Sequence, residues 1–332
     1  MTCRICSNAD GNVAYKVREM NLGFREWFSY FQCSRCGCLQ IRAFPPDIGK
    51  YYPPTYYSFG APEPAVSRPV SRIRALTRGI RDRYAIVGRG IAGRILHGFW
   101  PNPGLEEQAA AWFPGEGAKE AGLTRRSRIL DVGSGAGKIL VQLQAAGFSR
   151  LLGIDAFVES DLEYPGGLRI LKRTIHEVSG RWDLIMFHHS FEHMADPEQA
   201  LDAAANLLSP NGTCLIRLPL VSSYAWEHYG VDWVQLDAPR HFFLHSIESL
   251  GRLARHAGLS ISKIVYDSGP FQFLGSELYR RDIPLHSTAP ADVEARAAAF
   301  TAGELSEFDR QARALNAAGR GDQAAFYLRR VR

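Results

Sequence analysis

ILDVGSGAG, residues 129–137, is the stretch that decides the fold. An apolar run typical of a strand passes directly into three glycines at alternate positions, Gly133, Gly135 and Gly137, and then into a helical pattern. Open α/β sheets bind their ligands at the carboxyl ends of the strands, and glycines let a ligand lie against the bare backbone there. The stretch therefore predicts a nucleotide-like cofactor at a sheet edge.

The glycine spacing and the end of the next strand indicate which kind of cofactor to expect. A dinucleotide fingerprint that starts at Gly133 and Gly135 needs a third glycine where this chain has Lys138, so the spacing disfavours a nicotinamide cofactor. Asp155 ends the second predicted strand, 20 residues beyond Gly135. A carboxylate at that place can accept hydrogen bonds from both ribose hydroxyls.

Apolar runs and helical patterns alternate from Arg125 onward. Such alternation predicts a parallel sheet with helices on both faces. Asp196 followed by Pro197 is a helix-start signal. The predicted strands are 128–132, 151–154, 168–171, 183–188, 213–218 and 260–266, and the predicted helices are 137–147, 197–208 and 246–257.

Three segments carry a family resemblance. DVGSGAG (131–137), GIDAF (153–157) and RWDLIMFHHSFEHMADPEQAL (181–201) resemble motifs of class I S-adenosylmethionine-dependent methyltransferases, over roughly residues 125–265. The resemblance implies an α/β fold with a doubly wound, mostly parallel, Rossmann-like seven-stranded sheet, and S-adenosylmethionine as cofactor. It implies that the cofactor site contains Asp131 beside the methionine part, the backbone of Gly133, Ser134, Gly135 and Gly137, Asp155 on the ribose, and His188 after the fourth strand. The segment 173–176 lacks the acidic residue that often faces adenine in the family.

Five of the six cysteines lie within the first 38 residues. Cys3, Cys6, Cys33 and Cys36 form two pairs with two residues between the partners, and two such turns complete a tetrahedron around a zinc ion. Disulfides and unligated core thiols are the alternatives. Cys38 is interpreted as a spare thiol, which could replace Cys36.

A basic segment follows a stretch rich in proline and tyrosine at 44–70, which reads as a linker or a binding loop. Between Arg68 and Arg94 there are eight arginines and one acid, and apolar residues over 72–99 recur at the helical period. The pattern predicts one basic amphipathic helix. Such a helix can contact an anionic membrane or phosphates, or can pack on the next domain through its apolar stripe.

Histidines follow the fourth strand, at the edge where cofactor and acceptor should meet. Methyl transfer to a hydroxyl group or a carbon acid needs a base, and His189 and His241 are the leading candidates, with Glu192 and His193 beside them. The connection 219–245 is far longer than an ordinary loop, which indicates an acceptor-binding insert. Its polar and aromatic candidates are Tyr224, His228, Tyr229, Trp233, Arg240 and His241.

Composition indicates the general class of protein. The chain has 332 residues, of which 46% are hydrophobic and 22% charged, with a net charge of +5, values typical of a globular protein rather than a disordered one. No apolar run is long enough to span a bilayer, and the N-terminus lacks a signal core, so we expect a cytoplasmic protein. The expected organisation is a zinc-ribbon-like module (1–43), a linker with the basic helix (44–124), the methyltransferase domain (125–285) and a C-terminal helical extension (286–332).

The prediction of the acceptor rests on a further family resemblance. The zinc module, the linker and the segment PFQFLGSELYRRDIPL (270–285) together resemble zinc-containing methyltransferases of bacterial sugar, polysaccharide and natural-product pathways. The expected acceptor is a small molecule, a glycan or a nucleotide sugar. RNA methylation is one alternative, but the segment 188–191 lacks the Asn/Asp-Pro-Pro-aromatic signature of enzymes that methylate base nitrogens. A non-catalytic protein that binds the cofactor and a partner is another.

Overall fold

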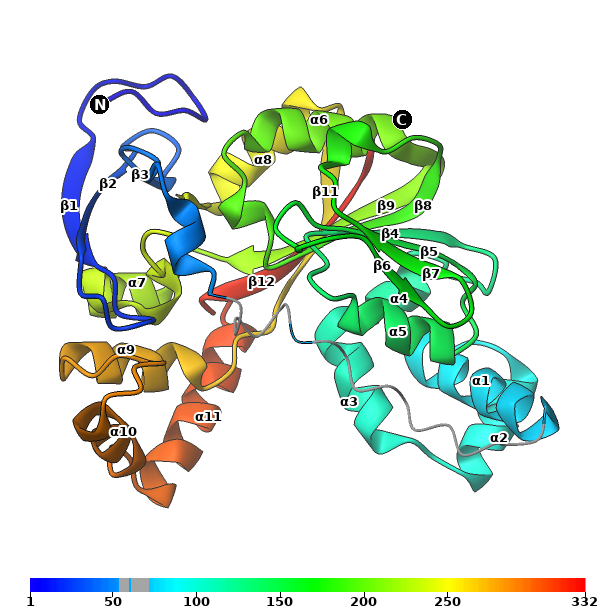
Figure 1. Ribbon diagram of the computed structural model, residues 1–332. Coiled ribbons are helices and arrows are strands. Elements are labelled where there is room, and N and C mark those ends of the chain that lie inside the picture. Colours follow the sequence, from blue (N-terminus) through cyan, green and yellow to red (C-terminus); the bar gives the residue numbers. More distant parts are fainter. Residues whose placement is uncertain (54–59, 61–71, 332) are drawn as a thin grey trace.

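A computed structural model describes residues 1–53, 60 and 72–331 of the protein. Its central element is an eight-stranded sheet in the order β11-β12-β9-β8-β4-β5-β7-β6, in which β9, β8, β4, β5 and β7 are parallel neighbours (Figure 1). The strands are β4 (Arg128–Val132), β5 (Arg150–Ile154), β6 (Leu162–Tyr164), β7 (Leu168–Leu171), β8 (Trp182–His188), β9 (Leu208–Pro219), β11 (Leu259–Tyr266) and β12 (Gln323–Arg330). The predicted doubly wound, mostly parallel sheet and its six strands are confirmed. The sheet has eight strands where seven were expected, because the short antiparallel β6 adds one at the edge.

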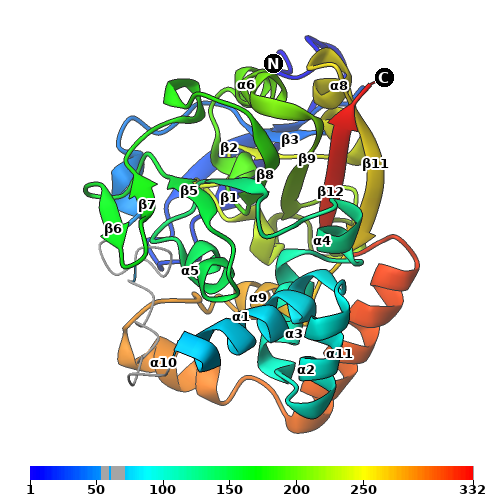
Figure 2. The ribbon, with the colours of Figure 1, turned by 90° about the vertical axis from the view of Figure 1, so that its right-hand side faces the viewer.

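The end of the chain differs from the prediction. Residues 286–332 were expected to form a helical extension, and α10 (Pro290–Ala297) and α11 (Ala302–Ala317) are indeed helices. Residues 323–330, however, form β12, which pairs antiparallel with both β9 and β11 (Figure 2). Residues 323–328 are all buried, because their side chains alternate between the two hydrophobic cores that cover the faces of the sheet. The predicted boundary at 285 therefore cuts through the sheet, since the last strand comes from the C-terminus.

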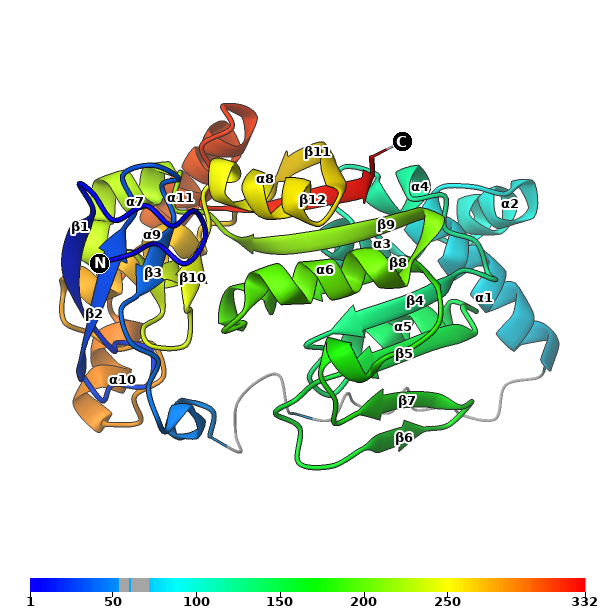
Figure 3. The same ribbon diagram turned by 90° about the horizontal axis from the view of Figure 1, so that it is seen from above.

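Helices cover both faces of the sheet (Figure 3). One face packs against α6 (Pro197–Leu207) and α8 (Ile247–His256), which agree with the predicted helices. The other packs against α5 (Lys138–Ala145), α3 (Pro103–Trp112) and α4 (Gly117–Glu120). The Asp196 side chain accepts a hydrogen bond from the Gln199 amide at the start of α6, as its cap position predicts. No helix in the described ranges combines the length and apolar character needed to cross a membrane.

The predicted single helix over 72–99 is wrong. The structure has α1 (Arg72–Val87) and α2 (Ile91–Phe99), with the chain reversing at Gly88 and Gly90, whose φ angles are +69° and +107°. The two helices pack against one another at Gly93, where an added Cβ would lie 2.6 Å from the Tyr84 Cβ. Glycines that adopt positive φ end the first helix, so the apolar stripe is divided between two helices.

The N-terminal module builds a second sheet of four strands, in the order β1-β2-β3-β10. Its strands are β1 (Val13–Arg18), β2 (Trp27–Gln32), β3 (Leu39–Ile41) and β10 (Phe243–Leu244). Since β10 comes from the connection 219–245, the module 1–43 is not separate from the rest of the chain. Its hydrophobic core also includes residues of α7 (Tyr224–Tyr229), α9 (Phe271–Arg280) and α11. The predicted linker falls partly outside the description, because residues 54–59 and 61–71 are not described.

Candidate functional site

The loop after β4 has the conformation that its glycines allow. Gly133, Gly135 and Gly137 adopt φ angles of +75°, +52° and +76°. A Cβ on Gly133 would lie 2.4 Å from the Ser190 Cβ, and one on Gly137 would lie 2.5 Å from the Ile170 Cδ1. Two causes therefore disfavour a side chain at each of these positions: the positive φ of the backbone, and a clash with the neighbouring side chain.

Asp155 connects this loop to the end of β5. Its Oδ2 accepts a hydrogen bond from the Gly135 amide at 2.8 Å, and its Oδ1 accepts one from the Phe157 amide at 2.8 Å. Each carboxylate oxygen can accept a further hydrogen bond. Asp155 also lines a cavity of about 340 Å³, so it can present these oxygens to a ligand while holding the loop.

Asp131 is buried at the end of β4, with 2% of its surface exposed. Its Oδ1 has no hydrogen-bond partner among the described residues. Burial, together with the neighbouring Asp155, raises the pKa of the Asp131 carboxyl to about 7. A buried carboxyl beside a second acid is suited to a ligand that brings a positive charge, such as the ammonium group of S-adenosylmethionine.

The cavity extends from this glycine loop to a group of histidines. Tyr52 covers part of it, with its ring stacked on Phe157 at 5.1 Å between centroids. Residues 173–176, where no acidic residue was found, also line it. The full lining is Tyr52, Val132, Gly133, Asp155, Ala156, Phe157, Arg173, Thr174, Ile175, His176, His189, Ser190, His193, Met194, Ala195, Asp196, Ala200 and Phe242.

Only some of the predicted cofactor residues reach this cavity. Gly133 and Asp155 line it, whereas Asp131, Ser134, Gly135 and Gly137 lie in the strand end and loop beside it. His188 is not among the lining residues. Burial lowers the pKa of His188 to about 3, and its Nε2 has no hydrogen-bond partner within the described part of the chain. Sequence reasoning missed Tyr52, although the tyrosine-rich stretch to which it belongs was a candidate binding loop.

Glu192 is the centre of a cluster with His189, His193 and His241. The carboxylate is fully buried, and none of the described residues makes a close hydrogen bond to its oxygens; the nearest donor is His189 Nδ1. Glu192 Oε1 lies 3.5 Å from His189 Nδ1 and 3.9 Å from His241 Nε2, and the His193 and His241 ring centroids are 4.7 Å apart. Burial opposes ionisation, but the three imidazoles outweigh it and lower the pKa of Glu192 to about 2.

The histidines of this cluster differ in what their ring nitrogens contact. His189 Nε2 lies 2.7 Å from the Arg217 guanidinium, which can only donate, so this nitrogen accepts. His193 Nδ1 lies 2.8 Å from the Arg240 carbonyl oxygen, and His241 Nδ1 lies 2.7 Å from the Gln235 carbonyl oxygen. A carbonyl can only accept, which assigns the proton to Nδ1 and leaves a lone pair on Nε2 of His193 and of His241.

The connection 219–245 is mainly structural. Trp233 is fully buried in the core of the N-terminal module and donates a hydrogen bond from its indole nitrogen to Asp322 at 3.0 Å. Tyr229 belongs to the same core, and Tyr224 stacks on His228. Of this connection only Phe242 lines the cavity. Most of its aromatic residues were predicted to bind an acceptor because the sequence does not indicate that the N-terminal module would pack on them.

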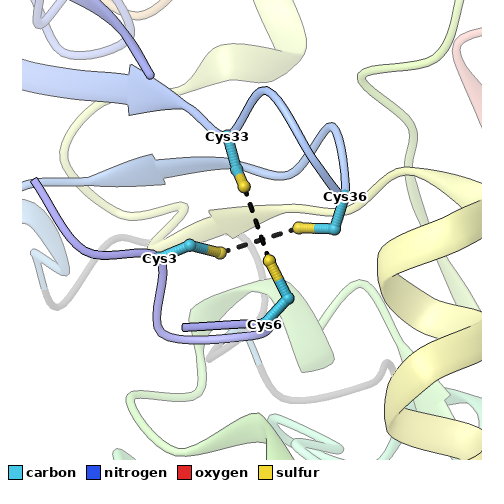
Figure 4. Close-up of side chains that lie close together, drawn as sticks. All are labelled: Cys3, Cys6, Cys33 and Cys36. Carbon is cyan, nitrogen blue, oxygen red and sulfur yellow. Dashed lines mark hydrogen bonds between the residues drawn. The ribbon is translucent and has the colours of Figure 1, made fainter. Parts of the chain in front are cut away.

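Cys3, Cys6, Cys33 and Cys36 converge, as predicted (Figure 4). The Cys3 and Cys36 sulfurs are 3.6 Å apart and the Cys6 and Cys33 sulfurs 3.5 Å apart, close to the roughly 3.8 Å expected around a tetrahedral zinc ion. The Ile5 amide and the Gln40 side-chain amide donate to the Cys3 sulfur at 3.4 and 3.2 Å. These donors suit a thiolate, so the residues fit a zinc ion. Cys38 is fully buried beside them and is not part of the four-sulfur group.

The central part of the chain is similar to known proteins. Residues 106–264 match the family model described as a methyltransferase domain. The chain is 30% identical over 162 residues to a ubiquinone biosynthesis O-methyltransferase from Bordetella avium and 29% identical over 156 residues to one from Chromobacterium violaceum. These matches cover 43% and 41% of this chain, and 66% of the length of each relative. Among solved structures, a cyclopropane synthase from Mycobacterium tuberculosis is 14% identical with a TM-score of 0.39, covering 79% of this chain and 99% of that one.

Proposed function

We propose that this chain, whose residues 106–264 match a methyltransferase domain, is a class I S-adenosylmethionine-dependent methyltransferase that transfers the sulfonium methyl group to a hydroxyl oxygen of a small molecule. A single observation carries the proposal: one cavity joins the loop of Gly133 and Asp155 to the histidine cluster. The two relatives are O-methyltransferases, which supports oxygen as the acceptor atom. A sugar hydroxyl of a glycan or nucleotide sugar falls within this class.

The assigned cofactor roles follow from the contacts. Asp155 would hold the ribose, and Asp131 would lie beside the methionine ammonium. During transfer the carbon–sulfur bond breaks, an oxygen–carbon bond forms, and the acceptor loses its hydroxyl proton. His193 is the cavity-lining imidazole with a lone pair on Nε2, so we assign proton acceptance to it in place of His189, whose Nε2 accepts from Arg217. Glu192 and His241 would then act as positioning residues.

The four thiols of the N-terminal module would bind one structural zinc ion. The distances between their sulfurs and the amide donors to Cys3 support this assignment. A site closed by four thiolates leaves no open position for a reacting group, so the ion would stabilise the fold and take no part in transfer. Because β10 pairs with β3, an ordered module also supports the segment that leads to His241.

We also propose that α2 contacts an anionic membrane. Ile91, Ile95 and Phe99 are four residues apart, share one face of α2, and are 76%, 53% and 89% exposed. Arg94 is exposed on the same helix and Arg89 just before it. Apolar side chains beside cations match a surface of anionic lipid, where the acceptor or its carrier would then be found.

Not every arginine of the basic segment is available for such a contact. Arg81 is 5% exposed, pairs with Asp82 at 2.6 Å and lies over the Trp100 ring at 3.8 Å. It therefore belongs to the packing of the helical pair. The membrane proposal rests on α2 and the turn that precedes it.

One labelling experiment tests the activity. Protein is incubated with methyl-labelled S-adenosylmethionine and with cell extracts fractionated into RNA, protein, glycolipids, nucleotide sugars and other small metabolites. We expect label in a hydroxylated small-molecule or glycan fraction, lost with Asp155→Ala and kept with Asp309→Ala, which changes an exposed residue of α11. Label in RNA would overturn the acceptor class, and no transfer by a protein that binds the cofactor would favour a non-catalytic role.

Flotation tests the membrane contact. The protein is mixed with vesicles of phosphatidylglycerol and phosphatidylcholine at low salt, and with phosphatidylcholine alone. We expect co-flotation with the anionic vesicles only, reduced at least about 10-fold by Phe99→Glu. Trp27→Glu is the matched control, because Trp27 is 63% exposed but lies on β2. Equal loss in both variants, or no co-flotation of the parent, would contradict the proposal.

A further inference from the structure

We propose that Glu192, His193 and His241 form a second metal site, which binds a divalent transition-metal ion at the edge of the methyl-transfer cavity. The three residues each offer a ligand atom, and these atoms all lie within 4.8 Å of one another. The only other group of this kind among the described residues is the four cysteines of the N-terminal module. The role of the ion in catalysis rests on the proposed function, but its binding does not.

The carboxylate of Glu192 supplies the first argument. It is fully buried, and the nearest donor among the described residues is His189 Nδ1, at a long 3.5 Å from Oε1. Oε2 has no hydrogen-bond partner among these residues. A buried ionised carboxylate with a single long contact to a donor is costly, because that contact replaces little of the water it has lost. A cation held against its oxygens would remove that cost.

The two histidines supply the second argument. His193 and His241 each direct Nδ1 to a backbone carbonyl, at 2.8 and 2.7 Å, which leaves the Nε2 lone pair for another partner. Metal-binding imidazoles are generally held in this way, since the second hydrogen bond fixes both the tautomer and the ring orientation. His241 Nε2 lies 3.9 Å from Glu192 Oε1, and one ligand atom of His193 lies within 4.8 Å of a ligand atom of each of these two residues.

A proton is the alternative to a metal ion among these three residues. His241 Nε2 lies 3.6 Å from Asp237 as well as 3.9 Å from Glu192, so a proton on this nitrogen could also balance the charge. Asp237, however, is already paired with the Arg240 guanidinium, with contacts of 2.7 and 3.0 Å. A proton on His241 would engage only that imidazole, whereas a metal ion would engage His193 as well.

The ligand set indicates the class of ion. Two imidazoles and one carboxylate are typical of zinc and related ions in sites that keep a coordination position open, unlike the four-thiolate site. His193 lines the cavity, so the ion would border the space assigned to the acceptor. When bound, it would lower the pKa of a coordinated hydroxyl, whose proton would pass to water, and His193 would serve as a ligand instead of as the proton acceptor.

Cobalt titration of the zinc-loaded protein tests the site directly. Protein that already holds its tightly bound zinc is titrated with Co²⁺ and followed by visible absorption. Cobalt bound by imidazole and carboxylate gives ligand-field bands in the visible, whereas cobalt that displaced zinc from the cysteines would reveal itself by thiolate charge-transfer absorption in the near ultraviolet. We expect one equivalent to bind with the visible bands alone.

Two variants locate the ion. Glu192→Gln keeps the size of the side chain, and His193→Asn removes an imidazole, and we expect each to weaken Co²⁺ at least about 100-fold, since changes in outer partners alone cost roughly 10–100-fold. His256→Ala is the matched control, because His256 lies at the surface beside Glu198. Thermal unfolding shows that each variant is folded.

The outcomes separate this inference from the proposed function. No cobalt binding to the zinc-loaded parent, or undiminished binding by both folded variants, would overturn the metal site. The same samples are titrated with S-adenosylhomocysteine by calorimetry, which reports on the cofactor site alone. Cobalt binding without S-adenosylhomocysteine binding would count against the methyltransferase assignment and leave the metal site standing.

Discussion

Replacing Asp131 by Asn should stabilise the protein and weaken its cofactor binding at the same time. The carboxyl is 2% exposed, its Oδ1 has no partner among the described residues, and Asp155 is its acidic neighbour. Such a group is unfavourable for the empty protein and useful only when a cationic ligand is present. Asn keeps the shape of the side chain and removes the charge.

The size of the effect follows from the pKa. The Asp131 pKa is raised to about 7 by burial and by Asp155, while an Asp carboxyl in an unfolded chain titrates near 3.9. Between these values the folded protein holds a proton that the unfolded chain has released, so the free energy of unfolding falls as pH rises from about 4 to about 7. Over about 3 pH units the loss approaches roughly 4 kcal/mol. The Asn variant has no carboxyl at this position, so its free energy of unfolding does not fall for this reason.

Urea unfolding at pH 4.5 and pH 8, without ligand, measures the stability difference. We expect the variant and the parent to be similar at the lower pH, and the variant to be more stable by up to about 4 kcal/mol at pH 8. Calorimetry with S-adenosylhomocysteine at pH 8 should show binding weaker by roughly 1.5–3 kcal/mol, the scale of a charge-assisted hydrogen bond. A variant that is less stable at pH 8, or one that binds as tightly as the parent, would refute the reasoning.

Three further changes test the cofactor loop and the zinc module. Asp155→Ala should weaken S-adenosylmethionine by roughly 1.5–3 kcal/mol in calorimetry, and equal binding would contradict the assigned role. Gly133→Ala should destabilise the protein by roughly 1–3 kcal/mol more than Gly167→Ala, because both glycines have positive φ but only the first meets a neighbour, Ser190. Cys33→Ser should lose one equivalent of zinc in metal analysis and lower the unfolding midpoint by at least about 5 °C, and an unchanged zinc content would exclude the site.

The cofactor loop and the cysteine group could be predicted because their information is local. Glycines at alternate positions after an apolar strand specify a turn that only positive φ permits, and Asp155 follows the next strand at its end. A pair of cysteines with two residues between them places both sulfurs on one turn. Neighbouring residues determine these features whatever the rest of the chain does.

The position of the last strand and the break in the basic helix were not predictable in the same way. The alanine-rich C-terminal region has a helical composition, and residues 323–330 become a strand because β9 and β11 leave a place between them. An apolar period runs through Gly88 and Gly90, but the chain turns there so that α2 can pack on α1. Tertiary packing decided both features, and the periodicity of apolar residues along the chain carries no information about that packing.

The sequence by itself determined the fold class, the glycine loop at the edge of the sheet and the two cysteine pairs, because each depends on spacing within a few residues or on strand order. Only the tertiary structure decided which residues face the cavity. It brought His241 beside Glu192 and His193, buried Trp233 and Tyr229 in the core of the N-terminal module, and placed Tyr52 over the cofactor edge. These contacts join segments far apart in the chain, and the free energy that selects them comes from burying side chains together, which no local spacing encodes.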